Sequence, residues 1–188
     1  MSKQVNNLQI IQWNCNSLIN NCDLISNFLE ETKPDIMMLN ETKCTYELAN
    51  FNFNHPSYDI LIKERNINPN HGGGVCIIIK KSLNYAEVKD FDCHNEEFIC
   101  IKIKIDKKEC LVGSLYNQPI NEINKDLFND ISNKFKHFLI GGDLNSKLIK
   151  LGCKLDNTSG RILDEIVETN NLIIRNDKQP TYFEYNLL

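Results

Sequence analysis

The chain has 188 residues, of which 41% are hydrophobic and 24% charged, a composition typical of a soluble globular protein and not of a disordered one. This length corresponds to one domain, so we expect residues 1–188 to form a single unit. The formal net charge of −4 argues against a protein that holds nucleic acid by bulk electrostatics alone. The longest apolar runs, such as 75–79, are too short to span a bilayer, and no N-terminal stretch resembles a signal peptide.

The eight cysteines form no Cys-x-x-Cys pair and no Cys/His cluster at zinc-finger spacing. Cys76 and Cys100 lie inside apolar runs, where a thiol behaves as a small hydrophobic side chain. Without a secretory signal, the cysteines are interpreted as reduced thiols of the core or surface, in preference to a disulfide framework.

The first half of the chain is predicted to contain four strands and one helix. Apolar runs bounded by turn-forming residues predict strands at 8–13, 36–39, 58–62 and 75–80. Apolar side chains at helical spacing predict a helix over 23–32, with Asp23 as its N-cap. We expect residues 44–57 to form a surface loop and residues 66–74 to form a turn between strands.

The second half adds a hairpin, two helices and two short strands. In residues 97–105 isoleucine alternates with cysteine or lysine, the period of a strand with one buried face. The pattern then predicts a connection at 106–109, strands at 110–116, 138–140 and 172–174, and helices at 124–135 and 159–169. Because strands and helices interleave without strict alternation, we predict a mixed α/β layered domain rather than a doubly wound parallel sheet.

Polar side chains follow four of the predicted strands, at the point where each strand ends. Asn14, Glu41 and Tyr116 follow three of them, and Asp143 and Asn145 follow the fourth. If these strands are neighbours, the side chains converge on one rim, where rigid strands position residues that loops leave accessible. Carboxylate and amide oxygens are ligands that suit Mg²⁺ or Mn²⁺. Taken singly, each of these residues is more often an ordinary turn former than a functional group.

Other motifs favour structural interpretations. The glycine run at 72–74 resembles an esterase oxyanion loop, but the chain has no Gly-x-Ser-x-Gly nucleophile elbow. The run also lacks the spacing of a Walker loop or a dinucleotide fingerprint, so we interpret it as a tight turn into a buried strand. Lysines 102, 104, 107 and 108 form a small basic patch, which we interpret as a solvated face rather than a DNA contact.

Five strings, in this order, carry a family resemblance: WNCNSL, LNETKC, HGGGVCIII, GSLYNQP and IGGDLN. Together with GRILDEIVETNNLIIRNDKQPTYF, they resemble the endonuclease/exonuclease/phosphatase superfamily. The resemblance is strongest to the apurinic-endonuclease-like domain of non-LTR (LINE/jockey-type) retrotransposons. It implies an α/β (α+β layered) fold, a four-layer β-sandwich flanked by helices, DNase-I-like and lacking the last strands.

The resemblance also implies roles for individual residues. It places Asn14 and Glu41 on a divalent metal, Mg²⁺ or Mn²⁺. It places Tyr116 on the scissile phosphate, Asp143 on the attacking water, and Asn145 on the phosphate or that water. Such a constellation fits phosphodiester hydrolysis, which needs an in-line water, a proton acceptor and positive charge on the phosphoryl oxygens.

Two further residues, Asn16 and Asn117, are candidates for substrate binding. Asn16 stands where some relatives have Asp, so it either reaches the metal through water or caps the turn. Ser146 and Lys147 follow Asn145 where many relatives have a small residue and then His.

The chain departs from the family pattern in one respect that affects activity. The family's Ser/Thr-x-Asp motif and its terminal Asp-His pair have no counterpart in residues 1–188, and none of the four histidines has the matching context. We therefore expect a C-terminally incomplete domain.

Three functions stay open. The first is a metal-dependent endonuclease that nicks target DNA for retrotransposition. The second is a catalytically incomplete remnant with at most weak nucleic-acid binding, and the third is a phosphoesterase of the same superfamily. The first implies DNA as partner, a reverse transcriptase encoded downstream in the same element, no membrane, and an intracellular, nuclear location.

Overall fold

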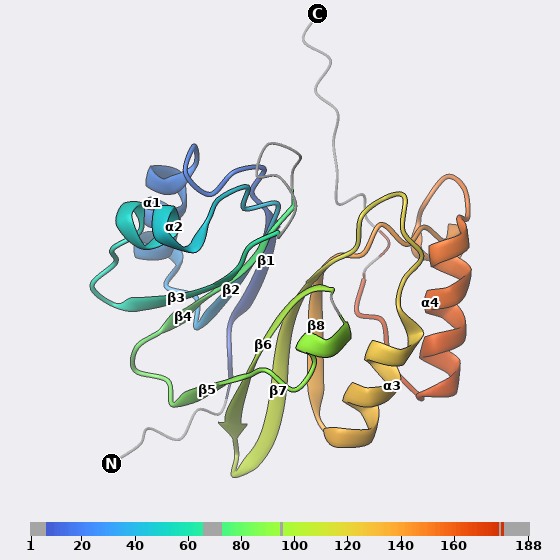
Figure 1. The fold of residues 1–188 in the computed structure, drawn as a ribbon. Coiled ribbons are helices and arrows are strands. Elements are labelled where there is room, and N and C mark those ends of the chain that lie inside the picture. The colour runs from blue at the N-terminus through green and yellow to red at the C-terminus, as the bar shows by residue number, and fades with distance from the viewer. Residues whose placement is uncertain (1–6, 66–72, 95, 177, 179–188) are drawn as a thin grey trace, which may run out of the picture.

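Two four-stranded sheets face each other in the computed structural model, which describes residues 7–65, 73–94, 96–176 and 178 (Figure 1). The first sheet has the order β1-β2-β4-β3. Its strands are β1 (Ile10–Asn14), β2 (Ile36–Asn40), β3 (Tyr58–Lys63) and β4 (Val75–Lys80). β1 pairs with β2 in parallel, whereas β4 is antiparallel to both of its neighbours.

The second sheet has the order β5-β6-β7-β8. Its strands are β5 (Tyr85–Val88), β6 (Glu97–Ile105), β7 (Lys108–Tyr116) and β8 (Phe138–Asp143). β7 pairs with β8 in parallel, and the other pairs are antiparallel. Each sheet therefore contains one parallel pair, and these two pairs turn out to carry the polar residues of the rim.

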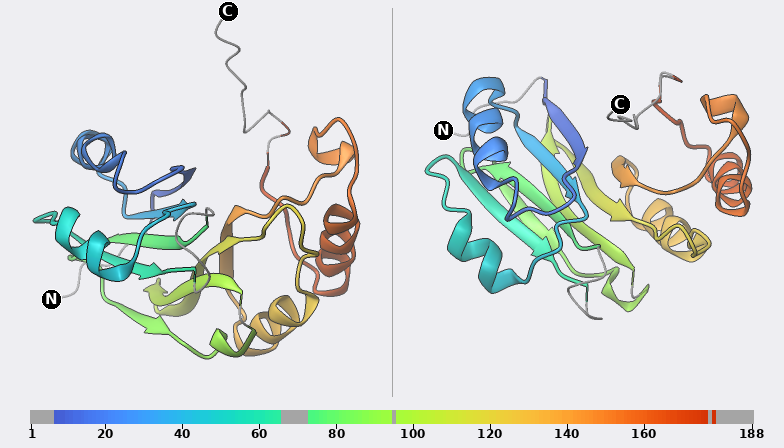
Figure 2. Two further views of the ribbon diagram at one scale, coloured as in Figure 1. Left: turned by 45° about the horizontal axis from the view of Figure 1, so that its top comes forward. Right: turned by 90° about the horizontal axis from the view of Figure 1, so that it is seen from above.

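Helices cover the outer face of each sheet, which makes four layers (Figures 1 and 2). The first sheet is covered by α1 (Cys22–Thr32) and α2 (Tyr46–Asn52), and the second by α3 (Lys125–Lys134) and α4 (Thr158–Thr169). Two short 3₁₀ turns, η2 (Asp92–His94) and η3 (Ile149–Leu151), lie in connections. The predicted four-layer α/β sandwich is confirmed.

Three apolar cores fill the spaces between the layers. One lies between the first sheet and α1 and α2, one between the two sheets, and one between the second sheet and α3 and α4. β2 is buried along its whole length because Met37 and Leu39 face the helices while Ile36 and Met38 face the other sheet. This explains why its sequence is a continuous apolar run and not an alternating one.

The β6–β7 hairpin is tighter than its sequence predicts. Ile105 pairs with Lys108, so the connection is two residues long instead of the predicted four. Asp106 and Lys107 both have positive φ, 47° and 67°, the conformation of a type I′ turn that matches the twist of the strands. The isoleucine face of β6 is buried as predicted and packs between the sheets. The prediction of a single buried face holds only for the second half of β6, because Phe98 and Cys100 on the opposite face are also buried.

The predicted N-cap of the first helix is wrong, because α1 begins at Cys22 after Asn21 and Asp23 lies inside its first turn.

Three elements differ from the prediction. The loop expected at 44–57 contains α2, which begins where the Thr45 hydroxyl accepts a hydrogen bond from the Leu48 N–H, 3.4 Å away. β5 was not predicted, because YAEV is short and has no apolar run. Residues 172–174 form no strand, and the side chain of Ile173 is 72% exposed while Leu172 and Ile174 pack against the core.

Three further predictions concern the cysteines, membrane-spanning segments and the turn at 66–74. All eight cysteines are free, and Cys76 and Cys100 lie in the core as expected. None of the helices in the described ranges combines the length and apolar character of a membrane span. Most of the predicted turn at 66–74, together with His71, falls outside the described residues.

Candidate active site at the ends of the parallel strands

The carboxyl ends of the two parallel strand pairs meet at one rim of the sandwich. In the first sheet Asn14 is level with Asn40, and in the second Tyr116 is level with Asp143. Glu41 follows directly after β2. The two sheets face each other, so these ends, separated by up to 129 positions in the sequence, come within hydrogen-bond distance.

Asn14 lies between the two carboxylates of this rim. Its Nδ2 donates to Oε1 of Glu41 at 2.9 Å and to Oδ2 of Asp143 at 3.1 Å. Its Oδ1 accepts from the backbone N–H of Asn16 at 3.2 Å. One amide therefore holds together the ends of β1, β2 and β8, and the predicted convergence of Asn14, Glu41 and Asp143 is what the structure shows.

Tyr116 joins the same group from β7. Its hydroxyl donates to Oε1 of Glu41 at 3.4 Å, and its side chain is largely buried. Burial raises the pKa of Tyr116 to about 12, and the carboxylates of Glu41 and Asp143 act in the same direction. The phenol therefore stays protonated at neutral pH and can donate a hydrogen bond to an anionic oxygen.

The loop after β8 is fixed by side-chain amides. Oδ1 of Asp143 accepts from the N–H of Asn145 at 3.2 Å, and Nδ2 of Asn145 donates to the carbonyl of Asn117 at 2.8 Å. Asn117 is only 2% exposed, and its Nδ2 donates to the carbonyls of Leu144 and Asn121 at 3.1 and 3.2 Å. Asn117 thus holds two loops together instead of facing the open rim.

Asn16 lies at the outer edge of the rim, where it contacts Lys43. The Lys43 ammonium donates to Oδ1 of Asn16 and lies 3.4 Å from Oε2 of Glu41. Lys43 belongs to the ETK string, but no pattern in the sequence assigns it a role. Its backbone is left-handed, with φ of 50°, and its side chain is 32% exposed.

Several non-glycine residues of the rim have left-handed backbone conformations. Positive φ values occur at Asn16 (47°), Glu41 (54°), Lys43 (50°) and Asn145 (47°). Such conformations cost on the order of 1–3 kcal/mol each and concentrate at functional sites, where the surrounding structure enforces them. Here they occur in the loops that directly follow β1, β2 and β8.

A buried amide fixes the two sheets against each other beneath the rim. Asn40 is fully buried, and its Nδ2 donates to the carbonyl of Leu115 at 3.1 Å in the facing sheet. Its Oδ1 accepts from Nε2 of Gln12 at 2.8 Å. Because Leu115 and Asn40 directly precede Tyr116 and Glu41, this cross-sheet bond sets the distance between those two side chains.

Glycine allows β8 to lie close to its neighbour β7 and to β2 of the facing sheet at this end. A Cβ on Gly142 (φ +146°) would lie 1.8 Å from the carbonyl oxygen of Leu115, and one on Gly141 would lie 2.3 Å from Cε of Met38. The backbone contact at Gly142 cannot be relieved by turning a side chain. The GGD string therefore brings Asp143 to the rim through close packing.

The donor set suits a hard divalent cation bound partly by water. Among the described residues, no group of three or more His, Cys, Asp or Glu side chains is arranged to hold a metal ion. Mg²⁺ often takes only one or two carboxylates, with water and substrate phosphate completing its shell. The side chain of Glu41 is 22% exposed, and turning the Asn14 amide by half a turn would present its oxygen, so both residues fit such an ion.

None of the described histidines donates or accepts a hydrogen bond at the rim. His55 packs against Tyr58 with ring centroids 4.9 Å apart, and His137 precedes β8. Nε2 of His94 lies 2.8 Å from Oδ2 of Asp130, a pair that joins η2 to α3.

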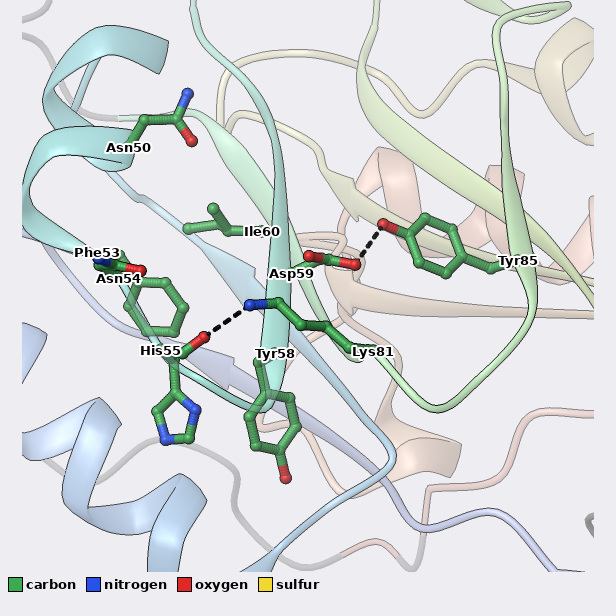
Figure 3. Close-up of a pocket in the computed structure, with 9 residues that line it drawn as sticks. All are labelled: Asn50, Phe53, Asn54, His55, Tyr58, Asp59, Ile60, Lys81 and Tyr85. Atoms are coloured by element: carbon green, nitrogen blue, oxygen red, sulfur yellow. Dashed lines mark hydrogen bonds between the residues drawn. The ribbon is translucent and has the colours of Figure 1, made fainter. Parts of the chain in front are cut away.

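A second polar hollow lies at the opposite end of the β3–β4 pair (Figure 3). It has a volume of about 310 Å³, and several of its polar groups are paired, whereas the buried Nε2 of His55 has no hydrogen-bond partner among the described residues. Lys81 donates to the backbone carbonyls of His55 and Pro56 at 3.1 and 3.3 Å, and the hydroxyl of Tyr85 donates to Asp59 at 3.1 Å. Asp59, the carboxylate among the residues that line the hollow, is thus already bound by a phenol.

A family model described as "Endonuclease/Exonuclease/phosphatase family" matches residues 11–185. The chain belongs to this family. The matched range contains every residue of the rim and all four layers of the sandwich.

Curated relatives come from mobile elements. The chain is 22% identical over 186 residues to the "Probable RNA-directed DNA polymerase from transposon BS" of Drosophila melanogaster. It is 23% identical over 185 residues to the "RNA-directed DNA polymerase from mobile element jockey" of the same species. Each match covers 96% of this chain, which spans only about a fifth of the length of these relatives (20% and 19%).

Solved structures share the fold. The endonuclease domain of TRAS1, a telomere-specific non-LTR retrotransposon, superposes with a TM-score of 0.74 at 17% identity, covering 94% of this chain and 77% of that one. An AP endonuclease from Archaeoglobus fulgidus gives a TM-score of 0.62 at 17% identity, with coverage of 96% and 80%. The predicted resemblance to retrotransposon proteins with a DNase-I-like fold is confirmed.

Proposed function

We propose that this chain is the nuclease domain of a non-LTR retrotransposon protein and that its rim hydrolyses a phosphodiester bond of DNA with the help of Mg²⁺ or Mn²⁺. The observation that carries the proposal is the meeting of Asn14, Glu41 and Asp143 through one amide. Family membership and the retrotransposon relatives support the nuclease branch over other phosphoesterases. Such an activity would be exercised in the nucleus, beside a reverse transcriptase of the same element.

In this proposal the residues of the rim divide the reaction between them. Glu41 and Asn14 would hold the divalent cation, which when bound supplies positive charge for the phosphoryl oxygens. Asp143 accepts the proton of the attacking water, and its Oδ1 is kept in place by the N–H of Asn145. The protonated hydroxyl of Tyr116 donates to the phosphate.

The remaining asparagines position these groups or contact the substrate. The side chain of Asn145 is held by the Asn117 carbonyl at 2.8 Å and borders the water that Asp143 activates. Asn16 is exposed and takes a place at the outer edge, where the DNA backbone would pass. The buried Asn117 supports the two loops and is assigned no direct contact with DNA.

The rate is expected to be low. Among the described residues no histidine is available at the rim to contact the phosphate, and one missing acid–base group typically costs ~10²–10⁴ in rate. A chain that shows no detectable nicking would correspond to the second alternative, the catalytically incomplete remnant.

The test is a nicking assay on supercoiled plasmid, which detects a single cleavage per molecule. The purified chain should convert plasmid to the open circle in Mg²⁺ or Mn²⁺ and stop when the ion is chelated. Parallel reactions contain single-stranded RNA or a soluble phosphomonoester, and we expect neither to be hydrolysed at a comparable rate. Nicking that persists after chelation would contradict the metal assignment, and faster hydrolysis of the monoester would favour the phosphoesterase alternative.

A further inference from the structure

Glu97, outside the predicted site, accepts an unusual number of hydrogen bonds. Nε and Nη2 of Arg65 lie 2.7 and 2.6 Å from its Oε1, and Nε2 of Gln118 lies 3.2 Å from the same oxygen. The N–H of Gly74 donates to its Oε2 at 2.6 Å. The side chains of Glu97 and Arg65 are only 12% and 14% exposed. Both oxygens of this carboxylate are occupied by its partners, so its role is to hold them.

One branch of this cluster leads to Glu41. The Gly74 carbonyl accepts from the N–H of Thr42 at 3.2 Å, and the Gly73 carbonyl accepts from the N–H of Lys43 at 2.9 Å. The glycine pair, fixed by Glu97, therefore holds the two residues that directly follow Glu41. Glycine is needed at position 74, where φ is +83° and a Cβ would lie 2.3 Å from Oγ1 of Thr42.

The other branch leads to Tyr116. Glu97 is the first residue of β6 and pairs with Tyr116 in the register of the β6–β7 ladder. Cζ of the Arg65 guanidinium lies 5.7 Å from the centroid of the Tyr116 ring, within the range of a cation–π contact. A Cβ on Gly73 would lie 2.2 Å from this Cζ, so the absence of a side chain there leaves room for the guanidinium.

We propose that Glu97 is a positioning residue that fixes Glu41 and Tyr116 relative to each other, through the turn at Gly73 and Gly74 on one side and Arg65 on the other. The inference rests on the proposed function, since it assigns Glu97 to the same reaction. Glu97 acts through its partners and contacts neither metal nor DNA. The two side chains that it aligns come from different sheets, and Glu97 provides a second connection between them beside the Asn40–Leu115 bond.

The test compares Glu97→Gln with the matched control Glu109→Gln, which removes an exposed carboxylate at the other end of the same hairpin. The amide introduced by Glu97→Gln keeps the shape but replaces one acceptor oxygen by a donor, which then faces the N–H of Gly74 or the guanidinium. The N–H of Gly74 loses a charged acceptor, the stronger kind, so the glycine pair is held less firmly. Amide exchange should therefore accelerate about tenfold at Thr42 and Lys43, whose N–H groups donate to the carbonyls of Gly74 and Gly73. Elsewhere in the first sheet exchange should be unchanged.

The kinetic part separates positioning from general stability. We expect Glu97→Gln to raise the Mg²⁺ concentration for half-maximal nicking about fivefold and to lower kcat about tenfold, while KM for plasmid stays within about twofold. Arg65→Lys keeps the positive charge but loses the planar fork, so it should show the same pattern more weakly. Glu109→Gln should match the wild type in every measurement.

Two results would overturn the proposal: equal exchange at Thr42 and Lys43 in Glu97→Gln and Glu109→Gln, or a uniform rise of exchange over the whole first sheet. If Glu97→Gln does not fold, Arg65→Lys and the same two amides decide the question. Failure of the proposed function gives a different result, in which the wild-type chain neither nicks DNA nor responds to Mg²⁺. The exchange experiment needs no activity and still decides whether Glu97 holds the turn.

Discussion

Two polar regions lie at opposite ends of the β3–β4 pair, and they differ in how their groups are satisfied. In the hollow around His55, Lys81 donates to backbone carbonyls and Asp59 accepts from Tyr85. At the rim, side chains from both sheets point at one another, and Glu41 and Asp143 share one amide donor. The rim therefore differs from the hollow in bringing two carboxylates from different sheets together, and not in the number of its unpaired polar groups.

The backbone repeats this difference. The rim places Glu41, Lys43, Asn16 and Asn145 in left-handed conformations, whereas none of the residues lining the hollow has a positive φ. At the rim, the free energy of folding therefore offsets the strain of these left-handed residues. Left-handed residues also occur away from the rim, at Lys33, Asp106 and Lys107, so this conformation alone does not mark a functional end.

The largest expected effect comes from removing a carboxylate at the rim. Asp143→Asn should lower the nicking rate by ~10²–10⁴, because the amide cannot accept the proton of the attacking water. The matched substitution in the hollow, Asp59→Asn, should leave the rate within a factor of about two. Plasmid nicking at saturating Mg²⁺ measures both, and comparable losses in the two variants would break the distinction between the two ends.

A second prediction concerns the bond that aligns the two sheets. Asn40→Ala should lower the free energy of unfolding by about 1–3 kcal/mol, since it leaves the buried Leu115 carbonyl and the Gln12 amide without their partner. Urea unfolding followed by the fluorescence of Trp13, the single tryptophan, measures this change. Ser114→Ala removes a hydroxyl that bonds only weakly, at 3.4 and 3.5 Å, and serves as the milder control. Equal stability of wild type and Asn40→Ala would show that the cross-sheet bond contributes nothing.

Features that depend on neighbouring residues in the chain could be predicted from the sequence, whereas features that depend on contacts between distant segments could not. Apolar runs predict β2 and β4 because burial on both faces leaves a continuous signal in the chain. The ends of such runs also predict Asn14, Glu41 and Asp143, since a strand that ends in a polar residue delivers it to a sheet edge. The helix α2 was missed because its seven residues are too few to show a clear apolar periodicity, and the capping residue Thr45 alone does not predict a helix.

Glu97 and Asn40 could not be recognised in the same way. A glutamate that opens a strand is ordinarily solvent-facing, and only the fold brings Arg65, Gly74 and Gln118 around it. One signal did exist for Glu97, because a two-residue turn at 106–107 fixes it opposite Tyr116. Asn40 gave none, since its partner Leu115 lies in the other sheet.

A third prediction uses pH at the hollow. Burial, the hydrogen bond to Asp59 and the nearby carboxylates raise the pKa of Tyr85 to about 12. In the unfolded chain the pKa of a tyrosine is about 10. The stability due to the phenol of Tyr85 is therefore fully present below about pH 10 and is lost as the pH rises from about 10 to about 12. Urea midpoints at about pH 9 and about pH 11.5 should therefore fall further in the wild type than in Tyr85→Phe. A parallel decline in both proteins would contradict the assignment.

The smallest expected effect belongs to Lys81. Lys81→Ala removes a cation whose partners are the His55 and Pro56 carbonyls, and it should change neither the nicking rate nor KM for plasmid by more than about twofold. The same two constants, measured over a range of plasmid concentrations, check this. A large rise in KM would mean that DNA reaches the hollow and that the two ends are not functionally distinct.

The central claim, that Asn14 and Glu41 at the rim hold a divalent cation, is tested most directly by calorimetric titration of Mg²⁺ in the absence of DNA. Glu41→Gln replaces a charged oxygen ligand by a neutral one and should weaken Mg²⁺ binding about tenfold or more. The exposed-helix control Glu47→Gln should bind as the wild type does, and all three proteins should share one urea midpoint. Equal Mg²⁺ affinity in the wild type and Glu41→Gln would remove Glu41 from the site and contradict the account.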